Sequence, residues 1–146
     1  MKKFIFSLEK VLNVKQQMLE VKKGEIAQVN TKIKEIENEE ERVKLEFHDY
    51  DTKMRLELER GTSPQNVMTY KVYFNSLIKK EKELAKEKEV QKEILKQKRE
   101  ELILLNSEIL GIEKLEEKQR AQYEKEARKT QERDIEEYIN QISATQ

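Results

Sequence analysis

The sequence predicts an all-α protein folded as a long antiparallel two-helix coiled coil, an α-hairpin. Three observations lead to this fold class. Charged residues make up 41% of the 146 residues and hydrophobic residues only 36%, which is too polar for an ordinary globular core. Apolar residues recur at heptad spacing in both halves of the chain, and the only proline stands between the halves. We therefore expect a single domain, 1–146, built from two helices.

The first helix is expected over about residues 4–60. Steps of four and three residues from Leu8 onward reach apolar side chains almost without a break, the exceptions being Lys15, Lys22 and Glu40. This repeat of 3.5 residues is typical of a coiled-coil seam rather than of the wider apolar face of a globular helix. The seam positions are Leu8, Leu12, Lys15, Leu19, Lys22, Ile26, Val29, Ile33, Ile36, Glu40, Val43, Phe47, Tyr50 and Met54.

The stretch RGTSPQN contains the chemistry of a helix stop followed by a helix start, which places a turn at residues 61–64. Gly61 can adopt the left-handed conformation that ends a helix. Ser63 can accept a hydrogen bond as the N-cap of the next helix, and Pro64 suits its first position. Because a connection this short returns the chain antiparallel, the turn predicts a hairpin rather than a border between domains.

The second helix is expected over about residues 64–140, with its own heptad seam. Since it is longer than the first helix, the part after about residue 120 has no intramolecular partner and forms an overhang. Apolar residues recur at helical spacing in this overhang, so either another molecule covers them or the tail frays. The seam positions are Val67, Tyr70, Phe74, Leu77, Glu81, Leu84, Lys88, Gln91, Leu95, Lys98, Leu102, Leu105, Ile109 and Ile112, and the overhang carries Ile135, Tyr138, Ile139 and Ile142.

Charge supports the antiparallel register. With the turn near residue 61, the numbers of facing residues add up to about 122. Glu37–Asp51, which is rich in acids, then faces Lys71–Ala85, which is rich in lysine. Opposite charges that meet across the pair favour this hairpin over a parallel dimer of straight chains.

The overall charge and the apolar runs narrow the possible locations and partners. Lysine plus arginine and aspartate plus glutamate both number 30, and this balance argues against nucleic-acid binding, which needs a surplus of cations. The apolar run in MKKFIFSLEK is too short for a signal peptide, and no run is long enough for a membrane span. We expect a cytoplasmic protein without direct membrane insertion.

Nothing in the sequence indicates catalysis, a metal site or a cofactor. There is no cysteine, and His48 is the only histidine, so neither a zinc site nor a catalytic triad can be assembled. Carboxylates at successive helical positions, as in Glu39–Glu41, point in different directions and are expected to be solvated. The three glycines are isolated, so no phosphate-binding loop is present.

Apolar residues that the seams do not use predict two interaction surfaces. One surface would lie where the start of the chain meets residues 102–115, unless the part after Gly111 bends back as a third short helix. The other would lie just after the turn, where Val72 and Tyr73 are expected to point away from the seam, unless Tyr73 lies flat on its own helix. The surplus residues of the first surface are Phe4, Phe6, Val11, Val14, Met18, Ile103, Leu104 and Leu110.

Three motifs resemble the flagellar export protein FliJ family. The opening FIFSLEKVLNVKQQ is similar to that family's aromatic start, F-x-F-x-L-x-x-V-L, which leads into a coiled coil. The middle GTSPQNVMTYKVYFNSL resembles its glycine turn followed by tyrosine, a second aromatic residue and leucine. The segment KLEEKQRAQYEKEARKTQERDIEEY resembles its charged tail. Together the motifs cover essentially the whole chain in the family's order.

The resemblance implies a non-enzymatic component of the bacterial flagellar type III protein export apparatus, similar in fold to the rotor stalk of rotary ATPases. Such proteins bind the hexameric export ATPase, contact the cytoplasmic domain of the export gate and handle export chaperones, which would place this chain peripherally at the cytoplasmic face of the membrane. By position, the ATPase-binding residues would be Phe4, Phe6, Leu8, Val11, Leu12, Gln119, Arg120, Tyr123, Arg128 and Arg133. The gate-binding residues would be Tyr70, Tyr73, Phe74 and Leu77.

Two alternatives remain open from the residues. One is a structural coiled coil that scaffolds a different bacterial complex. The other is a nucleic-acid-binding helical arm, for which the balanced charge is poor support. The lysine and glutamate along most of the second helix depart from a broader gate contact of the family.

Overall fold

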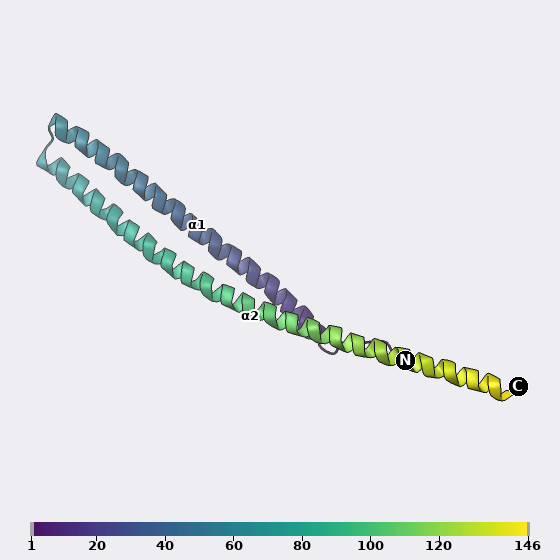
Figure 1. Cartoon of the computed structure of the whole chain (residues 1–146). Coiled ribbons are helices and arrows are strands. Elements are labelled where there is room, and N and C mark those ends of the chain that lie inside the picture. The colour runs from purple at the N-terminus through teal and green to yellow at the C-terminus, as the bar shows by residue number, and fades with distance from the viewer. Residues whose placement is uncertain (1, 146) are drawn as a thin grey trace. The chain divides into compact units, whose positions relative to one another are not determined.

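The computed structural model describes residues 2–145 and contains two helices, α1 (Glu9–Arg60) and α2 (Pro64–Thr145) (Figure 1). No strand occurs within these residues. The helices pack against each other in antiparallel orientation, which confirms the predicted fold class. The contacts divide the chain into two compact units: unit 1 combines the residues up to Val21 with those from Leu102 onward, and unit 2 is Lys22–Glu101.

The turn is built as its residues predict. Gly61 has a φ of 84°, a left-handed conformation that only glycine adopts without strain. The Ser63 hydroxyl accepts a hydrogen bond from the Asn66 backbone N–H at 3.2 Å, which caps α2. Pro64 is the first residue of α2, where its missing N–H costs no hydrogen bond.

The predicted seams form the interface between the helices. Every seam position is buried or half-buried except Phe47 and Glu81. Phe47 lies at the margin with 37% exposure and still contacts the Phe74 ring, at 4.8 Å between centroids. A sequence period of 3.5 residues thus located nearly all of the core.

Unit 2 contains two of the three buried clusters found among residues 2–145. The first is centred on Val43, which is 2% exposed and packs with Ile36, Leu77 and Leu84. The second joins Val29, Ile33 and Leu95, with Ile26 and Ile94 at its edge. The predicted charge pairing is confirmed here, because Lys80 Nζ lies 2.8 Å from a Glu39 carboxylate oxygen.

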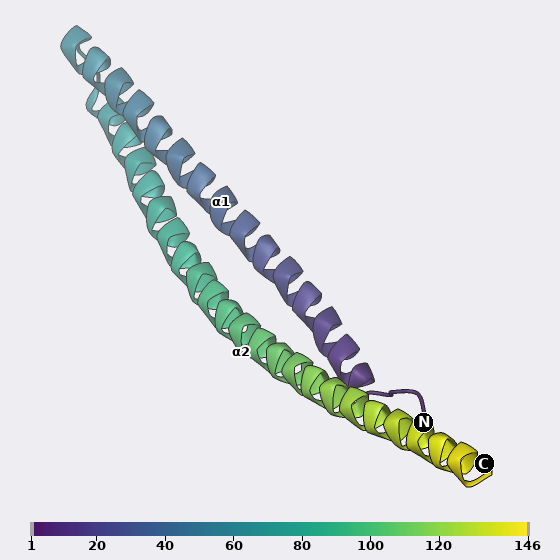
Figure 2. The ribbon, with the colours of Figure 1, turned by 45° about the vertical axis from the view of Figure 1, so that its right-hand side comes forward.

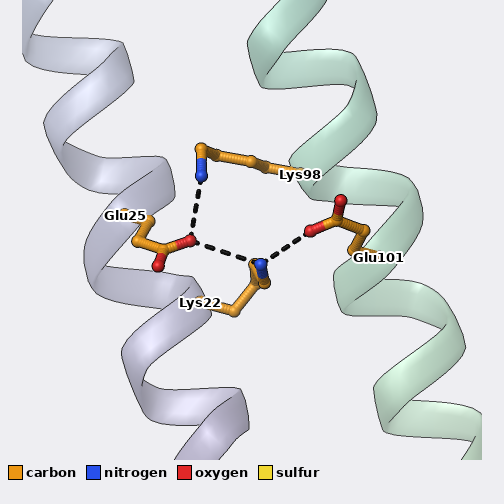
Figure 3. Close-up of polar contacts among 4 residues, drawn as sticks. All are labelled: Lys22, Glu25, Lys98 and Glu101. Carbon is orange, nitrogen blue, oxygen red and sulfur yellow. Dashed lines mark hydrogen bonds and ion pairs between the residues drawn. The ribbon is translucent and has the colours of Figure 1, made fainter.

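Four charged side chains fix the register at the end of unit 2 (Figure 3). Lys22 Nζ lies 3.3 Å from the Glu25 carboxylate and 2.6 Å from that of Glu101 on α2. Lys98 Nζ reaches the same oxygen of Glu25 at 2.9 Å. Hydrogen bonds to Glu101 and Glu25 raise the pKa of Lys22, and those from Lys98 and Lys22 lower the pKa of Glu25. Two lysines are thereby neutralised by two carboxylates from both helices, as coiled-coil pairing requires.

Unit 1 begins with a short non-helical segment. The structure starts α1 at Glu9 rather than near residue 4. The difference has a packing reason: the segment runs along α2 (Figures 1 and 2), and Phe6 is buried with only 5% exposure. The expectation that Phe6 is left uncovered is therefore wrong. Farther along α1, Leu12 packs with Leu105 and Ile109.

The end of α2 has no neighbour within residues 2–145. All residues of the stretch 128–145, which we call the tail, are exposed, and both ribbon views show no other segment beside them (Figures 1 and 2). The helix continues through Gly111 without a break, so the alternative of a third short helix folded back is wrong. The tail is helical in the structure, and the question left by the sequence is what covers its apolar residues.

Candidate partner-binding surfaces

An aromatic cluster joins the start of the chain to α2 in unit 1. The Phe4 and Tyr123 rings lie 5.5 Å apart between centroids. The Arg120 guanidinium lies 4.8 Å from the centre of the Phe4 ring, a cation–π distance. Tyr123 donates a hydrogen bond from its hydroxyl to the Lys2 backbone carbonyl at 2.5 Å. We call Phe4, Arg120 and Tyr123 the Phe4 cluster.

The Phe4 cluster borders a hollow on the surface of unit 1. Ile5, which the sequence argument did not single out, lines this hollow and is 80% exposed. An isoleucine this exposed beside an arginine offers an apolar anchor within a charged rim, which is the usual build of a partner contact. The hollow is lined by Lys3, Phe4, Ile5, Phe6, Glu9, Glu116 and Arg120.

The other residues of the predicted ATPase surface fall into two groups. Phe6 and Leu12 are buried and Leu8 is half-buried, so these side chains support the surface without being presented on it. Val11, with 43% exposure, and the α2 residues Gln119, Arg128 and Arg133 are exposed. Since successive helical residues rotate by about 100°, Arg128 lies on the side of α2 opposite Gln119. The structure therefore gathers the Phe4 cluster, with Phe6 beside it, and spreads the exposed remainder of the predicted residues over several faces.

The second candidate surface follows the turn, in unit 2, and is an aromatic cluster inside the hairpin. The Tyr50 ring of α1 lies 4.1 Å from the Tyr73 ring and 6.3 Å from the Tyr70 ring. Leu77 is 4% exposed, and Tyr73 packs against the same buried cluster. The expectation that Tyr73 points away from the seam is wrong. Tyr73 contributes to the interface because its ring is large enough to reach Tyr50 from beside the seam.

The two tyrosines have altered acidities. A hydrogen bond with Glu57, 2.9 Å from its hydroxyl, raises the pKa of Tyr70. Burial, followed by a hydrogen bond with Glu46, raises the pKa of Tyr73 to about 12. Both phenols remain neutral donors at physiological pH and hold carboxylates of α1, which ties α1 to the start of α2.

Exposed apolar side chains also occur on both helices near the turn, and only one of them, Val72, was predicted from the sequence. Val72, as predicted, is 66% exposed. Met68 on α2 and Leu56 and Leu58 on α1 are 62%, 49% and 51% exposed. Their spacing relative to the seam is the signal that finds them, because they are apolar residues at positions the seam does not occupy.

The described residues offer no site for a metal ion or a membrane span. No group of three or more histidine, cysteine, aspartate or glutamate side chains converges within residues 2–145. His48 is exposed. None of the helical residues described here forms a stretch long and apolar enough to cross a membrane.

Comparison with known families assigns the chain. Residues 4–146 match the sequence model described as flagellar FliJ protein. The chain belongs to the flagellar FliJ protein family. As a FliJ-family protein it is a component of flagellar protein export. No curated protein and no solved structure gives a significant match to it.

Proposed function

We propose that this FliJ-family chain is a non-enzymatic stalk of the flagellar type III export apparatus. It binds the hexameric export ATPase, promotes assembly and activity of the hexamer, and links it to the cytoplasmic domain of the export gate and to export chaperones. It acts in the cytoplasm, at the inner face of the membrane that holds the gate. The observation that carries the proposal is the family match over 4–146, together with an exposed helical tail that has no partner of its own.

The ATPase contact is proposed for unit 1 because its exposed and half-buried residues combine anchors and cations. Ile5 and the Phe4 cluster supply aromatic and apolar area, and Arg128 and Arg133 present charges on different faces of the tail. A single helical stalk in a ring of identical subunits meets each subunit differently. The subunits it binds best are stabilised in one conformation, so the stalk accelerates hydrolysis by differential binding and needs no catalytic group of its own.

The gate contact is proposed for the surface after the turn. Tyr70, Tyr73, Phe74 and Leu77 form its rigid base, since they are buried or half-buried between the helices. The side chain of Val72, on the same helix, is exposed and is the better candidate for direct contact. Apolar side chains held on a rigid base lose little conformational entropy on binding, which favours affinity.

The ATPase contact is tested by titrating the protein into the matching export ATPase and measuring hydrolysis rate and hexamer fraction. Both are expected to rise. The double variant Arg128→Glu with Arg133→Glu is expected to raise the concentration needed for half of this effect at least about tenfold, the usual cost of disrupting interfacial charge pairs. Arg99→Glu, which reverses one exposed arginine in unit 2, serves as the control and should behave like the unaltered protein. If the unaltered, folded protein changes neither rate nor assembly, the proposal is wrong.

The gate contact is tested by calorimetry with the isolated cytoplasmic domain of the gate. Val72→Glu is expected to weaken binding by about tenfold or more, because a carboxylate replaces an apolar anchor. Val90→Glu, at a valine of α2 with 57% exposure, is the matched control. Equal affinities of the two variants would place the gate contact elsewhere.

A further inference from the structure

α1 carries a second apolar stripe in unit 1, separate from its seam. Its members follow one another at spacings of three, four and three residues, so they share one helical face. Their exposed fractions are 43%, 55%, 52% and 62% in chain order. A heptad-spaced stripe with this exposure has the pattern of a coiled-coil seam and has no partner within the described chain. We call it the outer stripe; it consists of Val11, Val14, Met18 and Val21.

α2 contributes to the same side of unit 1. The ion pair between Lys15 and Glu108, 2.7 Å long, crosses from one helix to the other. Lys15 lies four residues after Val11 and three before Met18, so the ion pair emerges beside the outer stripe. Glu108 lies four residues after Leu104, which is 62% exposed. The outer stripe and Leu104 therefore flank one ion pair and line a common face.

The tail carries a matching stripe on a helix that is exposed all round. Ile135, Tyr138 and Ile142 are separated by three and four residues, the same spacing as the first three members of the outer stripe. They are 52%, 64% and 42% exposed, and Ile139 beside them is 54% exposed. We call these four residues the tail stripe.

We propose that the tail stripe of a second copy packs in parallel on the outer stripe of α1, and that a twofold axis repeats this contact in a dimer. The tail of the same copy cannot occupy the face, because α2 is one unbroken helix from Pro64 to Thr145 and contains no proline after its first residue. A tail parallel to α1 runs antiparallel to the α2 of its host. A twofold axis perpendicular to the two α2 helices gives them this orientation.

Charge favours this pairing over a contact between two tails. The tail segment 132–137 holds four carboxylates and one arginine. Residues 10–19 of α1 hold Lys10 and Lys15 and no acid. In the parallel alignment, with Ile135 opposite Val11, Asp134 comes opposite Lys10, whereas two tails in parallel would bring their carboxylates together. Equal spacing and opposite charge thus select the outer stripe as the surface that receives the tail.

The oligomeric state of the full chain tests the proposal by light scattering coupled to size exclusion. A dimer is expected at about 100 μM, where a micromolar dissociation constant would be saturated. Val14→Glu and Tyr138→Glu should each give a monomer, whereas Val90→Glu should remain a dimer. A monomer of the unaltered chain at all concentrations overturns the proposal. So does a dimer that is lost in Tyr138→Glu but kept in Val14→Glu, since that result indicates a contact between tails.

Cross-linking provides a test that does not depend on the stability of a charged variant. The chain has no cysteine, so single cysteines can be introduced without background. Chains with Val14→Cys and chains with Tyr138→Cys, mixed and oxidised, are expected to form at least about ten times more mixed disulfide than Val14→Cys with Val90→Cys, because a disulfide needs Cβ atoms within about 4.5 Å. Equal yields in the two mixtures overturn the proposal.

Discussion

Replacing Val43 by alanine tests whether the seam carries the stability of the hairpin. Val43 is 2% exposed and is surrounded by Ile36, Leu77 and Leu84. Val43→Ala removes two buried methyl groups at about 0.8 kcal/mol each, and the cavity left behind raises the cost to about 2 to 3 kcal/mol. The higher helix propensity of alanine returns about 0.5 kcal/mol.

The matched control is Val90→Ala, the same substitution at 57% exposure on α2. It gains the helix propensity and loses almost no burial, so its stability should be unchanged or higher by about 0.5 kcal/mol. Urea unfolding followed by far-ultraviolet circular dichroism measures both. The difference between the variants is expected to be about 2 to 3 kcal/mol, free of the propensity term. Midpoints and slopes that agree within error would refute the assignment of Val43 to the core.

Three further outcomes are expected. Gly61→Ala should lower the free energy of unfolding by about 1 kcal/mol because φ is 84° there. Gly24→Ala, inside α1, should raise it by up to about 1 kcal/mol. Urea titration measures both, and equal effects of the two substitutions would contradict this expectation. The pKa of Tyr73 is about 12 in the folded protein and 10.0 ordinarily, so the stability that its neutral phenol contributes is complete below about pH 10 and lost as the pH rises toward 12. Tyr73→Phe should reduce this alkaline loss of stability when urea midpoints are measured against pH. An unchanged pH profile would count against a buried, hydrogen-bonded Tyr73 phenol. Glu101→Gln removes the main cause of the raised pKa of Lys22, so it should lower the thermal midpoint at neutral pH by less than Val43→Ala does. In about 1 M salt, Glu101→Gln should unfold at the same temperature as the unaltered protein. A lower midpoint that persists in salt would show that more than charge is involved.

The fold was predictable because the interface residues of a coiled coil recur every 3.5 residues in the sequence. Seam positions such as Val43 and Leu77 are buried as the period requires. The turn was equally predictable, since Gly61 favours the left-handed conformation that ends a helix and Ser63 favours the N-cap position of the next. The lengths of the two helices then revealed the tail.

The candidate surfaces were less predictable, because heptad spacing identifies the residues of the seam but not the surroundings of the side chains outside it. Phe6 is off the seam and yet buried, since the non-helical start of the chain packs along α2. Tyr73 is also off the seam, and its ring packs against the Tyr50 ring of α1. The exposure of Ile5 could not be predicted from helical spacing, because Ile5 lies in a non-helical segment. Each difference arises from side-chain size or from a local departure from the helix.

The stoichiometry of the complex with the export ATPase tests the proposed stalk most directly. Native mass spectrometry of the two full-length proteins, mixed with the chain in excess, counts the copies in each assembly. A stalk in the centre of the ring predicts one chain for each ATPase hexamer, because one central position cannot be occupied six times. A complex with one chain on every ATPase subunit, or no complex at all, would contradict the account.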